Sequence, residues 1–189
     1  MELILVRHGL PERREDTSDP DLDLKGHDQA GRVAHWLAPE TIHEVWSSTM
    51  RRAVQTAEPF AAQAGLPIRQ HPGLVEFDRG SGRYVPTEVL KRENYEAWQA
   101  MSAGGHGVDM AAFQTEVVEA LEAIITANSG RSVAVFCHGG VINVWTAHVL
   151  GMSPPRVFFE ADYTSINRFM CARTGQRNVV SLNERAHLR

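Results

Sequence analysis

The sequence predicts an α/β fold of three layers, in which a mainly parallel central sheet lies between two layers of helices. Two apolar runs, residues 2–6 and 132–137, have the composition of strands that are buried on both faces. Candidate helices alternate with strands along the chain, which is the pattern of a parallel sheet covered on both sides. Each run also leads into a His-Gly pair, at His8 and His138. Because ligands in open α/β sheets bind just beyond the carboxyl ends of the strands, we expect the two histidines to meet over one substrate.

The residues beside the two histidines suit a phosphate group. Arg7 precedes His8, and its guanidinium offers a fixed positive charge with fork-shaped donors that match phosphate. Gly9 and Gly139 follow the histidines and allow a ligand to approach the backbone closely. A single histidine at the end of a strand is explained well enough by the capping of backbone carbonyls. Two such histidines together with Arg7 favour an active site.

The other elements follow in order along the chain. Residues 10–23 hold many charged side chains and two prolines, so they are expected to form a solvated loop that is either a lid over the site or a plain connector. Residues 25–37 place apolar side chains at the spacing of one helix face, and Pro39 stops that helix. Residues 43–46 are predicted to form a short strand, and residues 169–182 have the pattern of a hairpin.

A second helix is expected directly after the short strand, with Ser47 or Ser48 as its cap. A helix that begins at the carboxyl end of a strand directs free backbone N–H groups and its positive dipole end toward the site. Either Arg51 or Arg52 should face the same way, because neighbours on a helix point about a quarter of a turn or more apart. Spacing alone does not choose between the two arginines.

Composition excludes several classes of function. A length of 189 residues is enough for one domain with a full core, so we treat residues 1–189 as a single domain. The net charge of -4 gives no basic field for nucleic acid, and no apolar run approaches the length that spans a membrane. The first strand begins without a secretory signal, and the two cysteines, Cys137 and Cys171, suit a reducing compartment. We therefore expect a cytoplasmic protein without nucleic-acid or membrane partners, and we leave a homodimer open.

Four ordered motifs resemble those of the histidine phosphatase (phosphoglycerate mutase-like) superfamily. The first motif is residues 5–9, the third is residues 74–76 and the fourth is residues 138–140. The second motif consists of Ser47-Ser48, Arg52-Ala53 and residues 55–57. Arg-His-Gly alone is a weak signal, but four motifs in order on the expected elements form a strong one. The resemblance covers nearly the whole chain and implies the three-layer fold of that family.

The resemblance also implies roles for individual residues. His8 would be the nucleophile, and Arg7, Arg52 and His138 would surround the phosphoryl oxygens. Glu76 would protonate the leaving alkoxide and then accept a proton from water, with Asp78 as the rival acid. No cofactor is implied, and the sequence shows no metal-binding motif.

The chain departs from the family pattern at two places. Leu10-Pro11-Glu12 follows Gly9, where many members have an acidic or amide residue and a small hydroxyl residue. The stretch also lacks the asparagine that contacts phosphate further on in those members. Beyond Gly80 the usual aromatic residue and acid are also replaced, so we expect residues 77–109 to determine substrate choice. Within this specificity segment, Arg79, Arg83 and Tyr84 could hold a second anionic or polar group of the substrate.

The function that these residues imply is a metal-independent phosphomonoesterase that acts on a small phosphorylated metabolite through a phosphohistidine on His8. Cofactor-dependent mutases of the family share the same intermediate but are typically longer, because they must exclude water from it. Protein-phosphohistidine phosphatases are short, but the best-known type lacks an acid equivalent to Glu76. A third alternative is a binding protein that holds phosphate-containing ligands without turnover.

Overall fold

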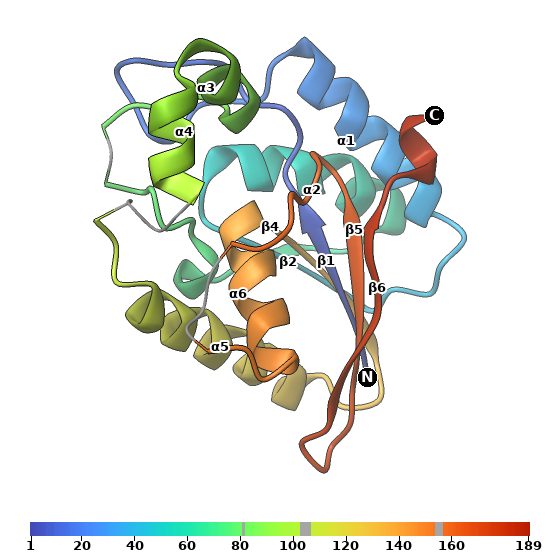
Figure 1. Ribbon diagram of the computed structural model, residues 1–189. Coiled ribbons are helices and arrows are strands. Elements are labelled where there is room, and N and C mark those ends of the chain that lie inside the picture. The colour runs from blue at the N-terminus through green and yellow to red at the C-terminus, as the bar shows by residue number, and fades with distance from the viewer. Residues whose placement is uncertain (81, 103–106, 154–156) are drawn as a thin grey trace.

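The computed structural model describes residues 1–80, 82–102, 107–153 and 157–189, and its centre is a six-stranded sheet (Figure 1). The order of the strands is β3-β2-β4-β1-β5-β6. Four neighbouring strands pair in parallel: β1 (Glu2–Arg7), β2 (Glu44–Ser47), β3 (Ile68–Gln70) and β4 (Ser132–Cys137). The antiparallel strands β5 (Ile166–Cys171) and β6 (Arg177–Glu184) complete one edge, where the sequence predicted a hairpin.

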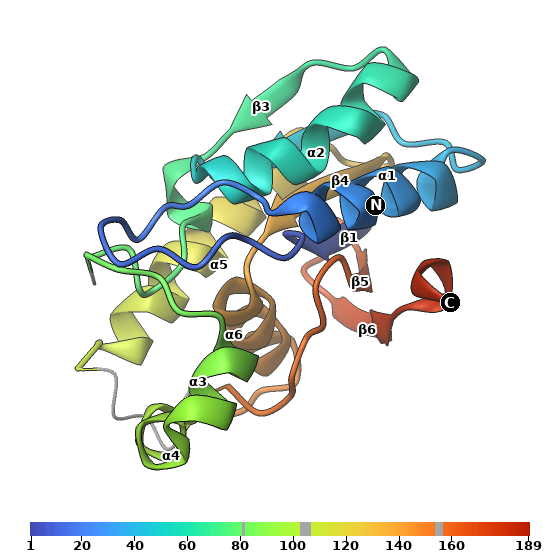
Figure 2. The same cartoon turned by 90° about the horizontal axis from the view of Figure 1, so that it is seen from above.

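Helices cover both faces of the sheet, as Figure 2 shows. On one face lie α1 (Leu24–Leu37) and α2 (Arg51–Ala64), and on the other lie α5 (Met110–Ala127) and α6 (Gly139–Val149). The shorter helices are α3 (Thr87–Glu93), α4 (Tyr95–Ser102) and two 3-10 turns, Pro72–Leu74 and Ala186–Leu188. The predicted α/β fold, with its mainly parallel sheet between two helical layers, is confirmed.

The continuous apolar character of β1 follows from its central position. Leu3 and Leu5 point into the core beneath α5 and α6, while Ile4 and Val6 point into the core beneath α1 and α2. All four side chains are fully buried. Since side chains alternate between the two faces of a strand, a strand covered on both faces needs apolar residues at every position.

The beginning of α2 differs from the prediction. The helix starts at Arg51, and its N-cap is Met50, so neither Ser47 nor Ser48 caps it. The Ser48 hydroxyl accepts a hydrogen bond from the Met50 backbone N–H and lies 2.9 Å from His138 Nε2. The first backbone N–H of the helix, at Arg51, donates to Asp19. The expected free amides at this helix end are therefore partly occupied by the loop that follows β1.

Two segments that the sequence left uncertain are joined over the carboxyl end of β1. The backbones of Arg14 and Tyr84 exchange two hydrogen bonds, of 3.1 and 2.7 Å, and so link loop 10–23 to the predicted specificity segment 77–109. Residue 81 and residues 103–106 of that segment lie outside the described residues. The loop is thus attached to the segment that follows Glu76, and it does not simply connect β1 to α1.

A search of the described residues finds no helix with the length and apolar character needed to cross a membrane.

Candidate active site

The two strand-end histidines meet, as the sequence predicts. His8 directly follows β1 and His138 directly follows β4, and these two strands are parallel neighbours in the sheet. The centroids of the two imidazole rings lie 5.1 Å apart. Both rings are buried, with exposed fractions of 2% and 0%. The parallel pairing of the strands therefore brings residues 130 positions apart into one site.

His8 is held in a single tautomer. Its Nδ1 lies 2.7 Å from the Gly9 carbonyl oxygen, which can only accept a hydrogen bond, so Nδ1 carries the proton. The lone pair is then on Nε2, and the Nε–H group of Arg52 points at it from 3.3 Å. Burial, followed by the charges of Arg52 and Arg7, lowers the pKa of His8 well below its usual value. His8 is therefore neutral, with an unprotonated nitrogen directed into the site.

Arg52, and not Arg51, faces the site. Its side chain is fully buried, and its Nη1 donates to the Ser18 carbonyl at 2.9 Å. Its Nη2 is buried and has no hydrogen-bond partner among the residues described. Arg51 is exposed and pairs with Asp21 at 2.6 Å. The structure thus resolves the choice that helical spacing left open, and it leaves Nη2 of Arg52 able to donate to a ligand.

Arg7 and His138 complete the set of donors around His8. Arg7 is anchored by Nη1, which donates to the Ala161 carbonyl at 2.5 Å, and it lies along the backbone of Gly139. His138 Nε2 makes its hydrogen bond with Ser48, and within the described part of the chain no partner is found for Nδ1. Burial is the main cause that lowers the pKa of His138, and the charges of Arg52 and His8 add to it.

Glu76 enters the site from the loop after the 3-10 turn Pro72–Leu74. Its two carboxyl oxygens accept from the backbone N–H groups of Gly140 at 2.9 Å and Phe77 at 3.1 Å. Burial is the largest cause that raises the pKa of Glu76 to about 7, and the nearby Asp78 carboxylate adds to it. Asp78 itself faces Arg52, with 3.6 Å between Oδ1 and Nη2. Burial raises the pKa of Asp78 as well, and the charge of Arg52 opposes that rise. The two acids therefore differ in their partners, because Asp78 faces a guanidinium whereas Glu76 accepts from two backbone N–H groups.

The site depends on the absence of a side chain at Gly140. A Cβ at this position would overlap Glu76 Oε1 and would lie 2.6 Å from Phe77 Cδ1. We predict that Gly140→Ala displaces the Glu76 carboxyl group and destabilises the fold by ~1–3 kcal/mol, as overpacking usually does. Thermal unfolding measures this effect.

The matched control for that prediction is Gly139→Ala. A Cβ at Gly139 would meet Arg7 Nε at 3.6 Å, which is an ordinary van der Waals contact. We expect the Gly139 variant to unfold within a degree or two of the unmodified protein. Equal melting temperatures for the two variants would contradict the proposed packing around Glu76.

The two arginines predicted to contact a second substrate group lie in the segment that follows Glu76. The Arg79 guanidinium makes two hydrogen bonds with Glu116 of α5, at 3.0 and 2.9 Å, and is half exposed. Arg83 is exposed in the segment before α3. Neither is joined by a hydrogen bond to His8 in the described structure, and their contact with substrate remains a prediction.

Sequence reasoning missed several residues that shape the site. Thr56 of α2 accepts a hydrogen bond from the Gly9 N–H at 2.9 Å and donates to the Arg52 carbonyl at 2.6 Å, so it fixes the backbone after His8. Tyr163, which precedes β5, has its ring centroid 5.7 Å from that of His8. Thr56 lies within a motif that the resemblance covers, whereas Tyr163 lies in a loop without any recognisable pattern.

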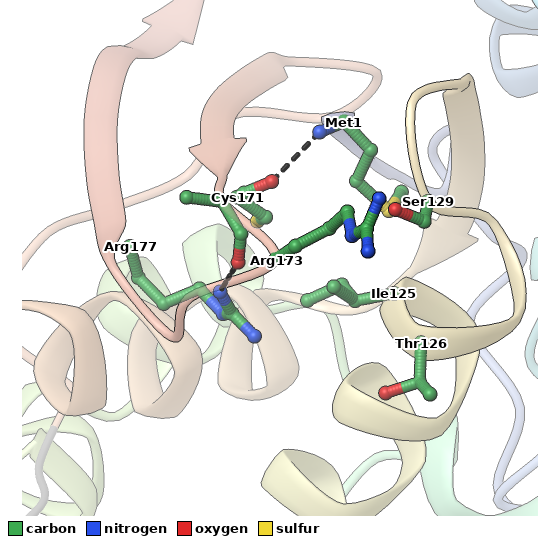
Figure 3. Close-up of a pocket in the computed structure, with 8 residues that line it drawn as sticks. Met1, Ile125, Thr126, Ser129, Cys171, Arg173 and Arg177 are labelled. Atoms are coloured by element: carbon green, nitrogen blue, oxygen red, sulfur yellow. Dashed lines mark hydrogen bonds between the residues drawn. The ribbon is translucent and has the colours of Figure 1, made fainter.

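A cavity at the opposite end of β1 contains none of the predicted site residues; its volume is about 210 Å³. Figure 3 shows its lining, where Met1 donates to the Cys171 carbonyl and Arg177 is a neighbour. The Arg177 guanidinium is already paired with Glu122 of α5. A search of the described residues finds no group of three or more His, Cys, Asp or Glu side chains that could hold a metal ion.

Comparisons with known proteins agree with this geometry. Residues 3–185 match the family model of the histidine phosphatase superfamily (branch 1). Phosphoglycerate mutase-like protein 4 of Arabidopsis thaliana is 31% identical over an alignment 155 residues long, which covers 75% of this chain and 67% of that protein. Phosphoserine phosphatase 1 of Hydrogenobacter thermophilus is 28% identical over an alignment 204 residues long, gaps included, which covers 100% of this chain and 94% of that protein.

Solved structures show the same fold. YhfR of Bacillus stearothermophilus superimposes with a TM-score of 0.82 at 22% identity and covers 100% of this chain and 99% of its own. The family model, the relatives and the arrangement of the four motifs all lead to one assignment. The chain belongs to branch 1 of the histidine phosphatase superfamily and is an enzyme of its phosphatase type.

Proposed function

We propose that this protein is a metal-independent phosphomonoesterase that hydrolyses a small phosphorylated metabolite through a phosphohistidine on His8. The observation that carries the proposal is the state of His8. Its imidazole is buried and neutral, its Nδ1 is fixed by the Gly9 carbonyl, and its Nε2 lone pair faces the guanidinium of Arg52. An unprotonated nitrogen beside fixed cations is what in-line attack on a phosphoryl dianion requires.

In the first step, the Nε2 lone pair of His8 forms a bond to phosphorus while the bond from phosphorus to the ester oxygen breaks. Glu76 transfers its proton to the departing alkoxide, which leaves as an alcohol. A carboxyl group with a pKa of about 7 retains this proton near neutral pH. The products of this step are the alcohol and a phosphohistidine, with Glu76 ionised.

In the second step, water replaces the alcohol. Its oxygen attacks phosphorus, and Glu76 takes up the proton that the water loses. The bond between phosphorus and His8 Nε2 breaks, and inorganic phosphate leaves. His8 is again neutral and Glu76 is again protonated, so the site is ready for another substrate.

Three side chains are proposed to stabilise the negative charge of the transferring group. Arg7 and Arg52 supply guanidinium donors, and His138 presents its Nδ1, for which the described structure shows no other partner. In phosphoryl transfer most of the rate enhancement comes from positioning and from electrostatic stabilisation of the equatorial oxygens. The fixed guanidinium groups of Arg7 and Arg52 serve this purpose, because they need little reorganisation during the reaction.

The presence of Glu76 favours an alkyl phosphate over a phosphorylated protein histidine as the substrate. An alkoxide is a poor leaving group and needs a proton, whereas a phosphoramidate needs less assistance. Relatives named phosphoserine phosphatase and glucosyl-3-phosphoglycerate phosphatase support a small phosphorylated metabolite. Relatives named as phosphoglycerate mutases support the alternative in which the phosphoryl group passes to a second acceptor.

The proposal is tested by phosphate release from alkyl phosphomonoesters and from p-nitrophenyl phosphate, with a metal chelator present, for the unmodified protein and for Glu76→Gln. We expect Glu76→Gln to reduce turnover of the alkyl esters much more than turnover of p-nitrophenyl phosphate, because p-nitrophenolate leaves without a proton. The alkyl activity of the unmodified protein should also fall as the pH rises through about 7, since Glu76 then loses its proton.

Each part of the proposal would be contradicted by a different experimental result. Equal losses on the two ester types in Glu76→Gln would exclude Glu76 as the acid. Loss of activity with the chelator would exclude metal independence. Conversion of an ester to a positional isomer without release of phosphate would identify a mutase, and binding of phosphate esters without any turnover would identify a binding protein.

A further inference from the structure

Two tyrosine rings lie against the guanidinium groups of Arg7 and Arg52, the two arginines beside His8. The Cζ atom of Arg7 is 3.9 Å from the ring centroid of Tyr163, and the Cζ atom of Arg52 is 4.8 Å from the ring centroid of Tyr84. Both distances are within the range of a cation–π interaction. Each guanidinium of the site is therefore covered on one side by the face of an aromatic ring.

The two tyrosines are also joined to each other. Their phenol groups form a side-chain hydrogen bond, and Tyr84 is 6% exposed. Burial raises the pKa of Tyr84 above its usual value, so its phenol remains neutral at the pH at which the site operates. The backbone of Tyr84 is fixed by its two hydrogen bonds to Arg14 of loop 10–23. The pair thus links this loop, the specificity segment and the loop before β5.

An aromatic face is a suitable neighbour for an arginine that must bind phosphate. It attracts the guanidinium through the ring quadrupole, but it occupies none of the N–H donors. A carboxylate in the same place would take up those donors in hydrogen bonds and would repel the incoming phosphoryl dianion. The buried Nη2 of Arg52 makes no hydrogen bond in the described parts of the chain, and the nearby Asp78 Oδ1, at 3.6 Å, is beyond hydrogen-bond distance, so this donor can still bind a ligand.

We infer that Tyr84 and Tyr163 are positioning residues that hold the guanidinium groups of Arg52 and Arg7 in the orientation that binds the phosphoryl group. The inference rests on the proposed function, because it assigns the two rings to the same phosphate site. The rings act on the phosphoryl group only through the arginines, and their aromatic faces, not their phenol hydroxyls, carry the effect.

The test is the dissociation constant for inorganic phosphate, measured by calorimetry, in Tyr84→Leu, Tyr163→Leu and the corresponding phenylalanine variants. We expect each leucine variant to bind phosphate about tenfold more weakly, because it lacks the ring face. Each phenylalanine variant keeps the ring and should stay within about threefold of the unmodified protein. Tyr95→Leu is the matched control, since Tyr95 is 53% exposed and stacks on Trp98 in α4.

If the leucine variants do not fold, a variant with pentafluorophenylalanine at position 163 tests the inference instead. The fluorinated ring keeps the shape of phenylalanine but reverses the ring quadrupole. We expect it to bind phosphate more weakly than Tyr163→Phe, at a similar melting temperature. Equal phosphate binding by these two variants, or by folded leucine variants and the unmodified protein, would overturn the inference.

A phenylalanine variant as weak as the leucine variant would also overturn it, because the phenol and not the ring face would then carry the effect. Phosphate binding is measured without turnover, so this test is independent of the catalytic proposal. If the protein binds phosphate as described but hydrolyses no ester, the proposed function fails while the role of the tyrosine pair stands.

Discussion

Replacing His8 with alanine is expected to abolish ester hydrolysis. The variant lacks the nitrogen that attacks phosphorus, and the proposal gives the other side chains different tasks: His138 Nδ1 faces the phosphoryl oxygens, and Glu76 is held by two backbone N–H groups. We expect kcat for p-nitrophenyl phosphate to fall by at least ~10³-fold, in line with the large losses that follow removal of a nucleophile. Steady-state release of p-nitrophenol measures the loss.

His27→Ala is the control for this substitution. His27 is an exposed residue of α1 and has no contact with the site in the described structure. Its replacement should leave kcat unchanged, and both variants should unfold cooperatively. Near-normal turnover in His8→Ala would exclude His8 as the nucleophile.

Arg52→Lys is expected to have the second largest effect. A lysine carries the same charge and three N–H donors, but all three are on one nitrogen and cannot match the spacing of the planar guanidinium, whose separate nitrogens face His8, Ser18 and the phosphoryl oxygens. Removal of one donor that stabilises transition-state charge typically reduces the rate by about 10²–10³-fold, and we expect kcat/KM to fall by that order.

The neighbouring Arg51→Lys variant separates this effect from a general change of charge. Arg51 is exposed and pairs with Asp21 at the surface, where such pairs contribute little to stability. We expect Arg51→Lys to retain nearly full activity. Similar kcat/KM values for the two lysine variants would mean that Arg52 does not contact the transferring group.

The sequence predicts the structure best where the constraint on a residue comes from its own helix or strand or repeats along it. Leu3 to Val6 are continuously apolar because β1 is covered on both faces, and this pattern alone identifies a central strand. His8 and His138 could be paired before the structure because parallel strands end at one edge of the sheet. Motif order then indicated the roles of Arg52 and Glu76.

Predictions failed where a side chain has a partner that is distant in sequence. Ser48 is a good candidate for a helix cap by composition, but its hydroxyl lies beside His138, 90 positions later, and Met50 occupies the cap. The pairing of Tyr84 with Tyr163 could not be predicted either, because both lie in loops without periodicity. The contact of Arg79 with Glu116 likewise depends on how the specificity segment packs on α5.

The most direct test of the account is a rapid-quench experiment on the phosphorylated enzyme. The protein is mixed with a labelled phosphomonoester, quenched in alkali, in which phosphohistidine is stable, and analysed by peptide mass spectrometry. The account predicts one phosphoryl group on His8, formed before steady state, lost with release of inorganic phosphate and absent from His8→Ala. Active enzyme that never carries phosphate on His8, under conditions in which alkyl esters are hydrolysed, would contradict the central claim.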